Sequence, residues 1–198
     1  PTEMNADDIG KLIKDYVNAA KRAISIGFQI IEIHAAHGYL LHSFMSPISN
    51  KRIDKYGGNH KGRIKLLLEI VEAIRKEIPE KTPIFCRISA IDGIKDGWTI
   101  QDSVVLSKIL SEKGVDVIDC SSGGIIGRPR FAISEDGEPL KNHTDRGLGF
   151  QVPLADEIKK KQEQEKKKIE IRKQKIAEQE RLKKERAERK IFEKKAQE

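Results

Sequence analysis

Short apolar runs alternate with segments of helical spacing along the first two thirds of the chain. Apolar residues recur at every third or fourth position from Ile9 to Ile24, and again over about residues 63–77 and 102–113, which is the period of an amphipathic helix. Compact, largely apolar runs rich in β-branched residues follow at about residues 28–34, 84–89 and 115–120, each short enough for a buried strand. The pattern predicts helix, strand, helix, strand, helix and strand, in that order.

Residues that start or end helices stand where this pattern needs them. Asn5 is placed as an N-cap, and Asp7 and Asp8 fall in the first helical turn, where negative charge is favourable at the positive end of the helix dipole. Gly27 and Gly114 follow two of the helical segments, and glycine commonly ends a helix. These signals support the predicted boundaries.

The alternation of short buried strands with helices indicates an α/β fold with parallel strands joined by right-handed crossovers. Two architectures fit this order, a (β/α)8 barrel and an open doubly wound sheet. The glycine pattern G-x-G-x-x-G, typical of open dinucleotide-binding sheets, follows none of the predicted strands. The absence of this motif argues against the doubly wound sheet, but it does not decide between the two architectures.

The chain from residue 123 onward differs in composition from the rest. Residues 123–150 are rich in Gly, Pro and charge and predict a long loop, after which a helix of Lys, Glu, Gln and Arg begins near residue 151 and continues to about residue 197. From Glu157 onward there are 17 Lys or Arg and 10 Asp or Glu, so this tail carries the whole net charge of +7. Its large apolar residues are too sparse for the seam of a stable coiled coil. We therefore expect a globular part, residues 1–156, and a solvated helical or partly disordered tail, residues 157–198.

Cysteine usage and hydropathy predict the compartment. Cys86 and Cys120 are the only two cysteines and lie far apart in the sequence, so neither a C-x-x-C pair nor a metal site is expected, and a reducing, cytoplasmic setting is the simplest interpretation. No apolar run approaches the roughly 18 residues of a membrane span. We expect a soluble protein without a membrane partner.

Candidate chemistry is concentrated in residues 31–41. His34 stands at the predicted end of a strand, His37 follows three residues later, and Tyr39 two residues after that. Two imidazoles and a phenol on one loop at a strand end suit general acid–base chemistry. A histidine near a strand end is more often structural, so a catalytic role for this group rests on the three residues occurring together.

The same region resembles a known family. The segment IEIHAAHGYLLHSFMSPISNKRIDKYGG, residues 31–58, together with FCRISA at 85–90 and VDVIDCSSGG at 115–124, closely resembles the Old Yellow Enzyme family, in particular its bacterial-type NADPH dehydrogenases. The resemblance extends from about Glu3 to Ala155. It implies a partial (β/α)8 barrel whose three strands correspond to the fourth, fifth and sixth. It also implies FMN as cofactor, NADPH or NADH as hydride source, and an α,β-unsaturated carbonyl as substrate.

The resemblance assigns roles to four residues. His34 and His37 would hydrogen-bond the substrate carbonyl oxygen and stabilise the enolate charge. Tyr39 would donate the proton to the substrate carbon. Arg87 would lie beside the flavin ring as a fixed positive charge, although without the resemblance a strand-end ion pair is the simpler reading. Asn50, Arg52, Asp54, Tyr56, Gly57 and Gly58 are expected to be scaffold, with Arg52 and Asp54 pairing to fix a turn.

Several features depart from the family pattern. Lys61 and Gly62 replace a usually acidic, helix-starting segment, so the following helix is expected to be less well capped. Sequence corresponding to the first three strands is absent, and after Ile158 the charged tail stands where the last two strands and the FMN phosphate site would follow. We expect the isolated chain to be catalytically incomplete, and unpaired strand edges could allow self-association. The alternative is a non-catalytic scaffold that acts through its basic tail, with nucleic acid an improbable partner.

Overall fold

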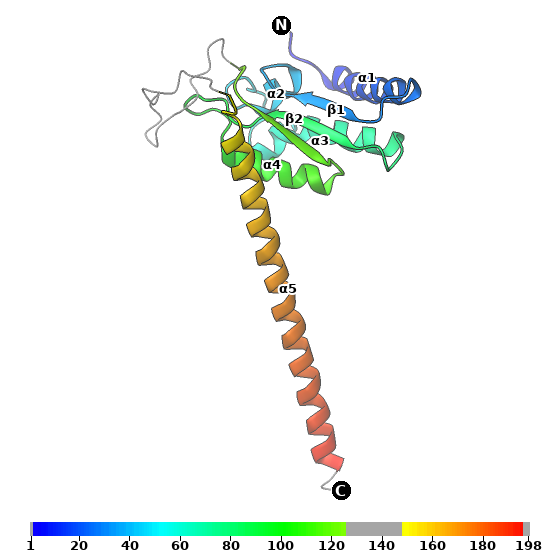
Figure 1. Ribbon diagram of the computed structural model, residues 1–198, viewed down its shortest axis with the longest axis vertical. Coiled ribbons are helices and arrows are strands. Elements are labelled where there is room, and N and C mark those ends of the chain that lie inside the picture. The colour runs from blue at the N-terminus through cyan, green and yellow to red at the C-terminus, as the bar shows by residue number, and fades with distance from the viewer. Residues whose placement is uncertain (1, 126–147, 196–198) are drawn as a thin grey trace. The chain divides into compact units, whose positions relative to one another are not determined.

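The computed structural model describes residues 2–125 and 148–195, with side chains as far as residue 183. Most of the loop predicted over residues 123–150 therefore lies outside the described residues. Figure 1 labels the elements in chain order. They are α1 (Ala6–Ser25), β1 (Ile31–Ala35), α2 (Leu40–Met45), α3 (His60–Glu77), β2 (Ile84–Ser89), α4 (Ile100–Glu112), β3 (Val117–Ser121) and α5 (Val152–Lys195).

The three strands form one parallel sheet in the order β1-β2-β3, as the alternation of strands and helices predicted. Two strands are shorter than expected. β1 begins at Ile31 rather than residue 28, because pairing starts where the Ile31 N–H donates to the Pro83 carbonyl at 3.1 Å. β3 begins at Val117 rather than residue 115, because the Val115 N–H donates to the Leu110 carbonyl at the end of α4. The helix α2, predicted as loop, is a single short helix after β1.

Side-chain caps fix the helix starts. Asn5 forms a capping box with Asp8 at the start of α1, as the sequence predicted for the N-cap. Thr99 forms another with Asp102, so α4 starts at Ile100 rather than near Asp102. Each such cap typically contributes about 1 kcal/mol.

The start of α3, for which a weaker cap was expected, has a single side-chain cap and lacks the capping box found in α1 and α4. The Asn59 side-chain oxygen accepts a hydrogen bond from the Gly62 N–H at 3.0 Å, and the helix begins at His60 rather than near Arg63. Gly62 is also required by packing, because a Cβ at this position would lie 2.1 Å from the Gly57 carbonyl oxygen. The glycine that looks like a weak helix start lets the helix approach the preceding turn.

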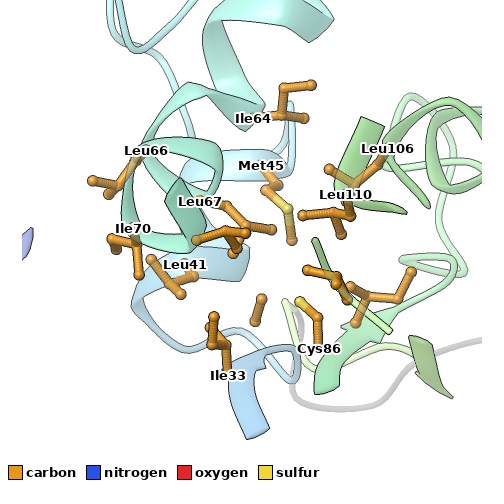
Figure 2. Packing of buried hydrophobic residues seen from close by; sticks show 14 of the residues in the cluster. Ile33, Leu41, Met45, Ile64, Leu66, Leu67, Ile70, Cys86, Leu106 and Leu110 are labelled. Atoms are coloured by element: carbon orange, nitrogen blue, oxygen red, sulfur yellow. The ribbon is translucent and has the colours of Figure 1, made fainter. Parts of the chain in front are cut away.

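The helices cover one face of the sheet. Strand residues of this face, such as Ile33 and Cys86, are fully or almost fully buried, and Figure 2 shows Leu67 from α3 and Leu110 from α4 converging on them. On the other face Glu32 and His34 are exposed, and Val117 keeps 40% of its surface exposed. The sheet thus has one apolar face that packs against helices and one exposed face that carries polar side chains. Ligands can approach only the exposed face.

Contacts divide the chain into two compact units, Pro1–Ile158 and Lys159–Glu198. Ile158 belongs to the first unit and is buried in its core, which corrects the expectation that it is a solvated tail residue, since the first turns of α5 supply apolar side chains to that core. In the second unit every described side chain from residue 163 to 183 is exposed. The predicted boundary between an oxidoreductase domain, residues 1–156, and a separate tail, residues 157–198, stays a prediction. Within residues 2–125 and 148–195, none of the helices has the length and hydropathy needed to cross a bilayer.

Candidate active site

A row of polar side chains crosses the open face near the carboxyl ends of the strands. His34 on β1 is the register partner of Arg87 on β2, and Arg87 is the partner of Asp119 on β3. Side chains at the same register position of parallel strands point to the same face. The sheet therefore brings together three groups that lie more than thirty positions apart along the chain.

Arg87 and Asp119 form an ion pair with an incomplete hydrogen bond. The Arg87 Nε and Asp119 Oδ2 atoms are 2.8 Å apart, yet Nε has no hydrogen-bond partner among the described residues. The contact is therefore an ionic attraction in which the Nε–H donor stays unused. The ion pair that residue type alone favoured is present, and it leaves Arg87 with an unsatisfied buried donor.

The three ring side chains singled out in the sequence lie together. The ring centroids of His34 and His37 are 5.1 Å apart, and those of His34 and Tyr39 are 5.4 Å apart. Tyr39 is 64% exposed, and His34 is exposed while His37 is half-buried. Two imidazoles and a phenol thus face the same accessible space above the end of β1.

The turn that carries these rings has an unusual backbone. His37 has φ of 60° and Gly38 has φ of 77°, and a left-handed conformation is uncommon for a residue other than glycine. The Ser89 hydroxyl accepts from the His37 N–H at 2.9 Å and donates to the Gly123 carbonyl at 2.7 Å. Such strain persists only where the surroundings fix it, and it is frequent at functional sites.

The loops after β1 and β3 touch through two glycines. A Cβ at Gly38 would lie 2.1 Å from the Gly124 carbonyl oxygen, and a Cβ at Gly124 would lie 2.2 Å from the His37 carbonyl carbon. Only glycine at both positions allows this backbone contact. The contact joins the ring cluster to the end of β3.

His37 also contacts the last residue of β3. Its Nε2 lies 2.5 Å from the Ser121 hydroxyl oxygen, and its Nδ1 has no partner among the described residues. Burial, followed by the nearby His34, Arg87 and His42 side chains, lowers the pKa of His37 below its ordinary value. The imidazole is therefore neutral near pH 7 and presents one free ring nitrogen to a ligand.

Sequence reasoning missed Ser89 and Ser121, which orient His37. Both are polar residues at the ends of apolar strands, and this position was the only local signal for them. The scaffold pair Arg52–Asp54 is present, with Nη2 and Oδ2 2.6 Å apart. The Asn50 amide donates to the carbonyl of Tyr56 at 2.8 Å and so closes the same turn.

The profile of a family described as NADH:flavin oxidoreductase / NADH oxidase matches residues 1–139. An NADH:flavin oxidoreductase of Gibberella zeae is 45% identical over 170 residues, which cover 81% of this chain and 38% of that protein. An NADPH dehydrogenase of Bacillus subtilis is 39% identical over 161 residues, which cover 80% of this chain and 42% of that protein. The chain thus spans about two fifths of the length of these relatives.

Two solved structures are also similar. A 2-naphthoyl-CoA reductase in complex with 2-naphthoyl-CoA is 30% identical with a TM-score of 0.67, over 80% of this chain and 23% of that one. A morphinone reductase variant in complex with tetrahydroNAD is 25% identical with a TM-score of 0.57, over 68% of this chain and 36% of that one. Both similarities in fold therefore extend over more than two thirds of this chain.

Proposed function

The chain belongs to the NADH:flavin oxidoreductase / NADH oxidase family, and we propose that it forms the substrate-binding and proton-donating part of an FMN-dependent ene-reductase. The observation that carries this proposal is the cluster of His34, His37 and Tyr39 beside the register row of Arg87. The family match covers every one of these residues. A purely structural scaffold that acts through its tail is not favoured.

The proposed architecture is the middle of a (β/α)8 barrel, with β1, β2 and β3 as its fourth, fifth and sixth strands. Its support is a parallel sheet with helices on one face and an open face that carries the polar row. In such barrels the open face would be the interior, and ligands bind at the carboxyl ends of the strands. The candidate residues stand at those ends.

The residues at this edge fit a flavin. Arg87 Nε and Ser122 Oγ are buried polar atoms without a hydrogen-bond partner among the described residues, and both lie at or near the ends of neighbouring strands. A ring with several acceptor atoms would satisfy such donors, and the guanidinium charge favours an electron-rich ring. When bound, FMN supplies the substrate with a hydride taken from NADPH or NADH.

The two histidines are suited to hold a carbonyl oxygen. His37 is neutral near pH 7, and a hydroxyl proton donated by Ser121 to Nε2 would leave the ring proton on Nδ1, free to donate to a ligand. His34, whose ring centroid lies 5.1 Å from that of His37, would donate the second hydrogen bond. Donors fixed in advance stabilise the enolate oxygen as negative charge develops on it.

Tyr39 is placed to complete the reaction. Its ring lies 5.4 Å from that of His34, and its exposure leaves the hydroxyl accessible to a bound substrate. Its phenolic proton would pass to the carbon next to the carbonyl carbon, while the other alkene carbon receives the hydride. The substrate class is an α,β-unsaturated carbonyl compound, and the conjugated acyl thioester carried by one solved neighbour has related chemistry.

A segment exchange tests this proposal. The part of the Bacillus subtilis NADPH dehydrogenase that matches this chain is replaced by residues 1–155, which gives a protein called here the exchanged enzyme. We expect it to bind FMN and to oxidise NADPH when 2-cyclohexenone is added. Flavin content and circular dichroism establish that it is folded. A folded, FMN-loaded exchanged enzyme that oxidises NADPH without reducing the enone would contradict the proposal.

The 198-residue chain itself should bind FMN weakly. Only three strands are present among the described residues, and the phosphate site of such barrels is built after the last two strands. Titration of the purified chain with FMN, followed by flavin fluorescence, measures the affinity. A yellow protein with one FMN per chain would overturn this part of the proposal.

A further inference from the structure

A buried histidine outside the ring cluster contacts the turn that carries it. His42 in α2 has no exposed surface. Its Nδ1 accepts a hydrogen bond from the Gly38 N–H at 2.8 Å, and its Nε2 lies 2.8 Å from Oδ1 of the equally buried Asp92. A single imidazole thus connects the turn after β1 with the loop after β2.

These contacts determine which ring nitrogen carries the proton. A backbone N–H can only donate, so Nδ1 of His42 must be the acceptor, and the proton of the neutral ring sits on Nε2 and points to Asp92. The other carboxylate oxygen of Asp92 accepts from the Ser46 hydroxyl at 2.5 Å and from the Trp98 N–H at 2.7 Å. Asp92 is therefore held from three directions and in turn holds the ring of His42.

The Gly38 N–H lies at the strained part of the turn. His37 on one side has φ of 60°, and Tyr39 on the other side is the N-cap residue of α2. Without its acceptor, the Gly38 N–H would be left unpaired in a part-buried site, which costs more than the net value of the hydrogen bond. The turn would then relax, and the rings of His37 and Tyr39 would move with it.

We infer that His42, oriented by Asp92, is a positioning residue that holds the Gly38 N–H and thereby sets the places of His37 and Tyr39. His42 does not itself reach the open face, because it is completely buried. The consequence of this role for alkene reduction rests on the proposed function.

Two substitutions separate the two contacts of the ring. In His42→Asn the side-chain oxygen can stand near the place of Nδ1 and accept from Gly38, while the contact with Asp92 is lost. In His42→Gln the amide nitrogen can stand near the place of Nε2 and donate to Asp92, while Gly38 loses its acceptor. A role through Gly38 predicts that Asn is the better replacement, whereas a role limited to satisfying Asp92 predicts Gln.

Amide hydrogen exchange in the 198-residue chain reports directly on Gly38. We expect the Gly38 amide to exchange about tenfold faster or more in His42→Gln than in the unsubstituted chain, with much smaller change in His42→Asn. Ile74→Val, which truncates the core in α3, serves as a control for general loss of stability. Equal exchange of Gly38 in the Asn and Gln variants would overturn the inference.

A measurement on the unsubstituted chain protects the test against variants that fail to fold. Nitrogen-15 spectra of the imidazoles should show the His42 proton on Nε2, and a proton on Nδ1 would overturn the inference. In the exchanged enzyme, His42→Gln should lower kcat for enone reduction about tenfold, while FMN reduction by NADPH changes little. An unchanged kcat together with altered Gly38 exchange would overturn the positioning role. An exchanged enzyme that never reduces enones would instead count against the proposed function, and the spectra and Gly38 exchange would still decide the geometry.

Discussion

His34 and Arg87 are direct partners in the register of the parallel sheet, and the same register continues from Arg87 to Asp119. The pairing places an imidazole beside a guanidinium that retains an unused donor at Nε. In the proposed enzyme, His34 would contact the substrate oxygen and its register partner Arg87 would contact the flavin. This relationship suggests that the two half-reactions depend on different residues of the row.

Replacing His34 should slow the half-reaction in which the alkene is reduced. In the exchanged enzyme, His34→Ala removes one of two donors to the carbonyl oxygen. The loss of such a donor typically costs about 3 kcal/mol of transition-state stabilisation, a rate decrease of roughly a hundredfold or more. Stopped-flow absorbance of the flavin follows both half-reactions. FMN reduction by NADPH, which needs no carbonyl contact, serves as the control and should not slow equally.

Removing the phenolic hydroxyl should affect proton donation alone. Tyr39→Phe keeps the ring packed against His34 but takes away the acid, so we expect enone binding and FMN reduction by NADPH to persist. The reoxidation of FMN by the enone should become slow, by about 10²-fold or more. An unchanged reoxidation rate would show that another group supplies the proton.

The protonation of His37 should depend on its burial and on the neighbouring His34 and Arg87 side chains. Its pKa is lowered by burial first and then by His34 and Arg87, so the NMR titration midpoint in the folded chain should lie below that in denaturant, about 6.5. Below that pH the unfolded chain binds more protons than the folded chain, so this group's contribution to stability is lost as pH falls. Arg87→Met should move the midpoint upward. A midpoint equal to that of the unfolded chain would contradict this account.

Alanine at Gly38 should be far more harmful than alanine at a comparable glycine. Gly58 has φ of 70° and open space around a hypothetical Cβ, whereas Gly38 has φ of 77° and the Gly124 carbonyl oxygen 2.1 Å away. Gly58→Ala should therefore cost only the backbone term of about 1 kcal/mol. Gly38→Ala should cost about 1–3 kcal/mol more, because the two loops must separate. Urea unfolding of both variants measures the difference, and equal losses would show that the glycine contact is not tight.

The charged tail should be the first part of the chain that proteases remove. Every described side chain from residue 163 to 183 is exposed, and a helix without a buried face gains little from packing. We expect brief trypsin treatment to yield a stable fragment that ends near Lys159. Mass spectrometry of the fragments gives the cleavage sites. Protection of the tail equal to that of α3 would indicate a partner surface for it.

The sequence alone determined the parallel α/β alternation and the candidate residues His34, His37 and Tyr39. Short apolar runs for the strands and helical spacing between them are local signals, so they can be recognised without any knowledge of the fold. The three rings are five positions apart at most, and a single turn is enough to bring them together. Local patterns did not predict the short helix α2. They also did not show that Gly62, at the start of α3, lies against the backbone of Gly57.

Only the tertiary structure decided how the turn is held. Ser89, Ser121 and Asp92 lie 52, 84 and 50 positions from the residues that they contact, His37 and His42. The same is true of the meeting of Gly38 with Gly124. Such contacts follow from strand register and loop closure, which no periodicity along the chain encodes. A polar residue at the end of an apolar strand is visible in the sequence, but its partner is fixed only when the parallel strands align and their ends meet at one edge of the sheet.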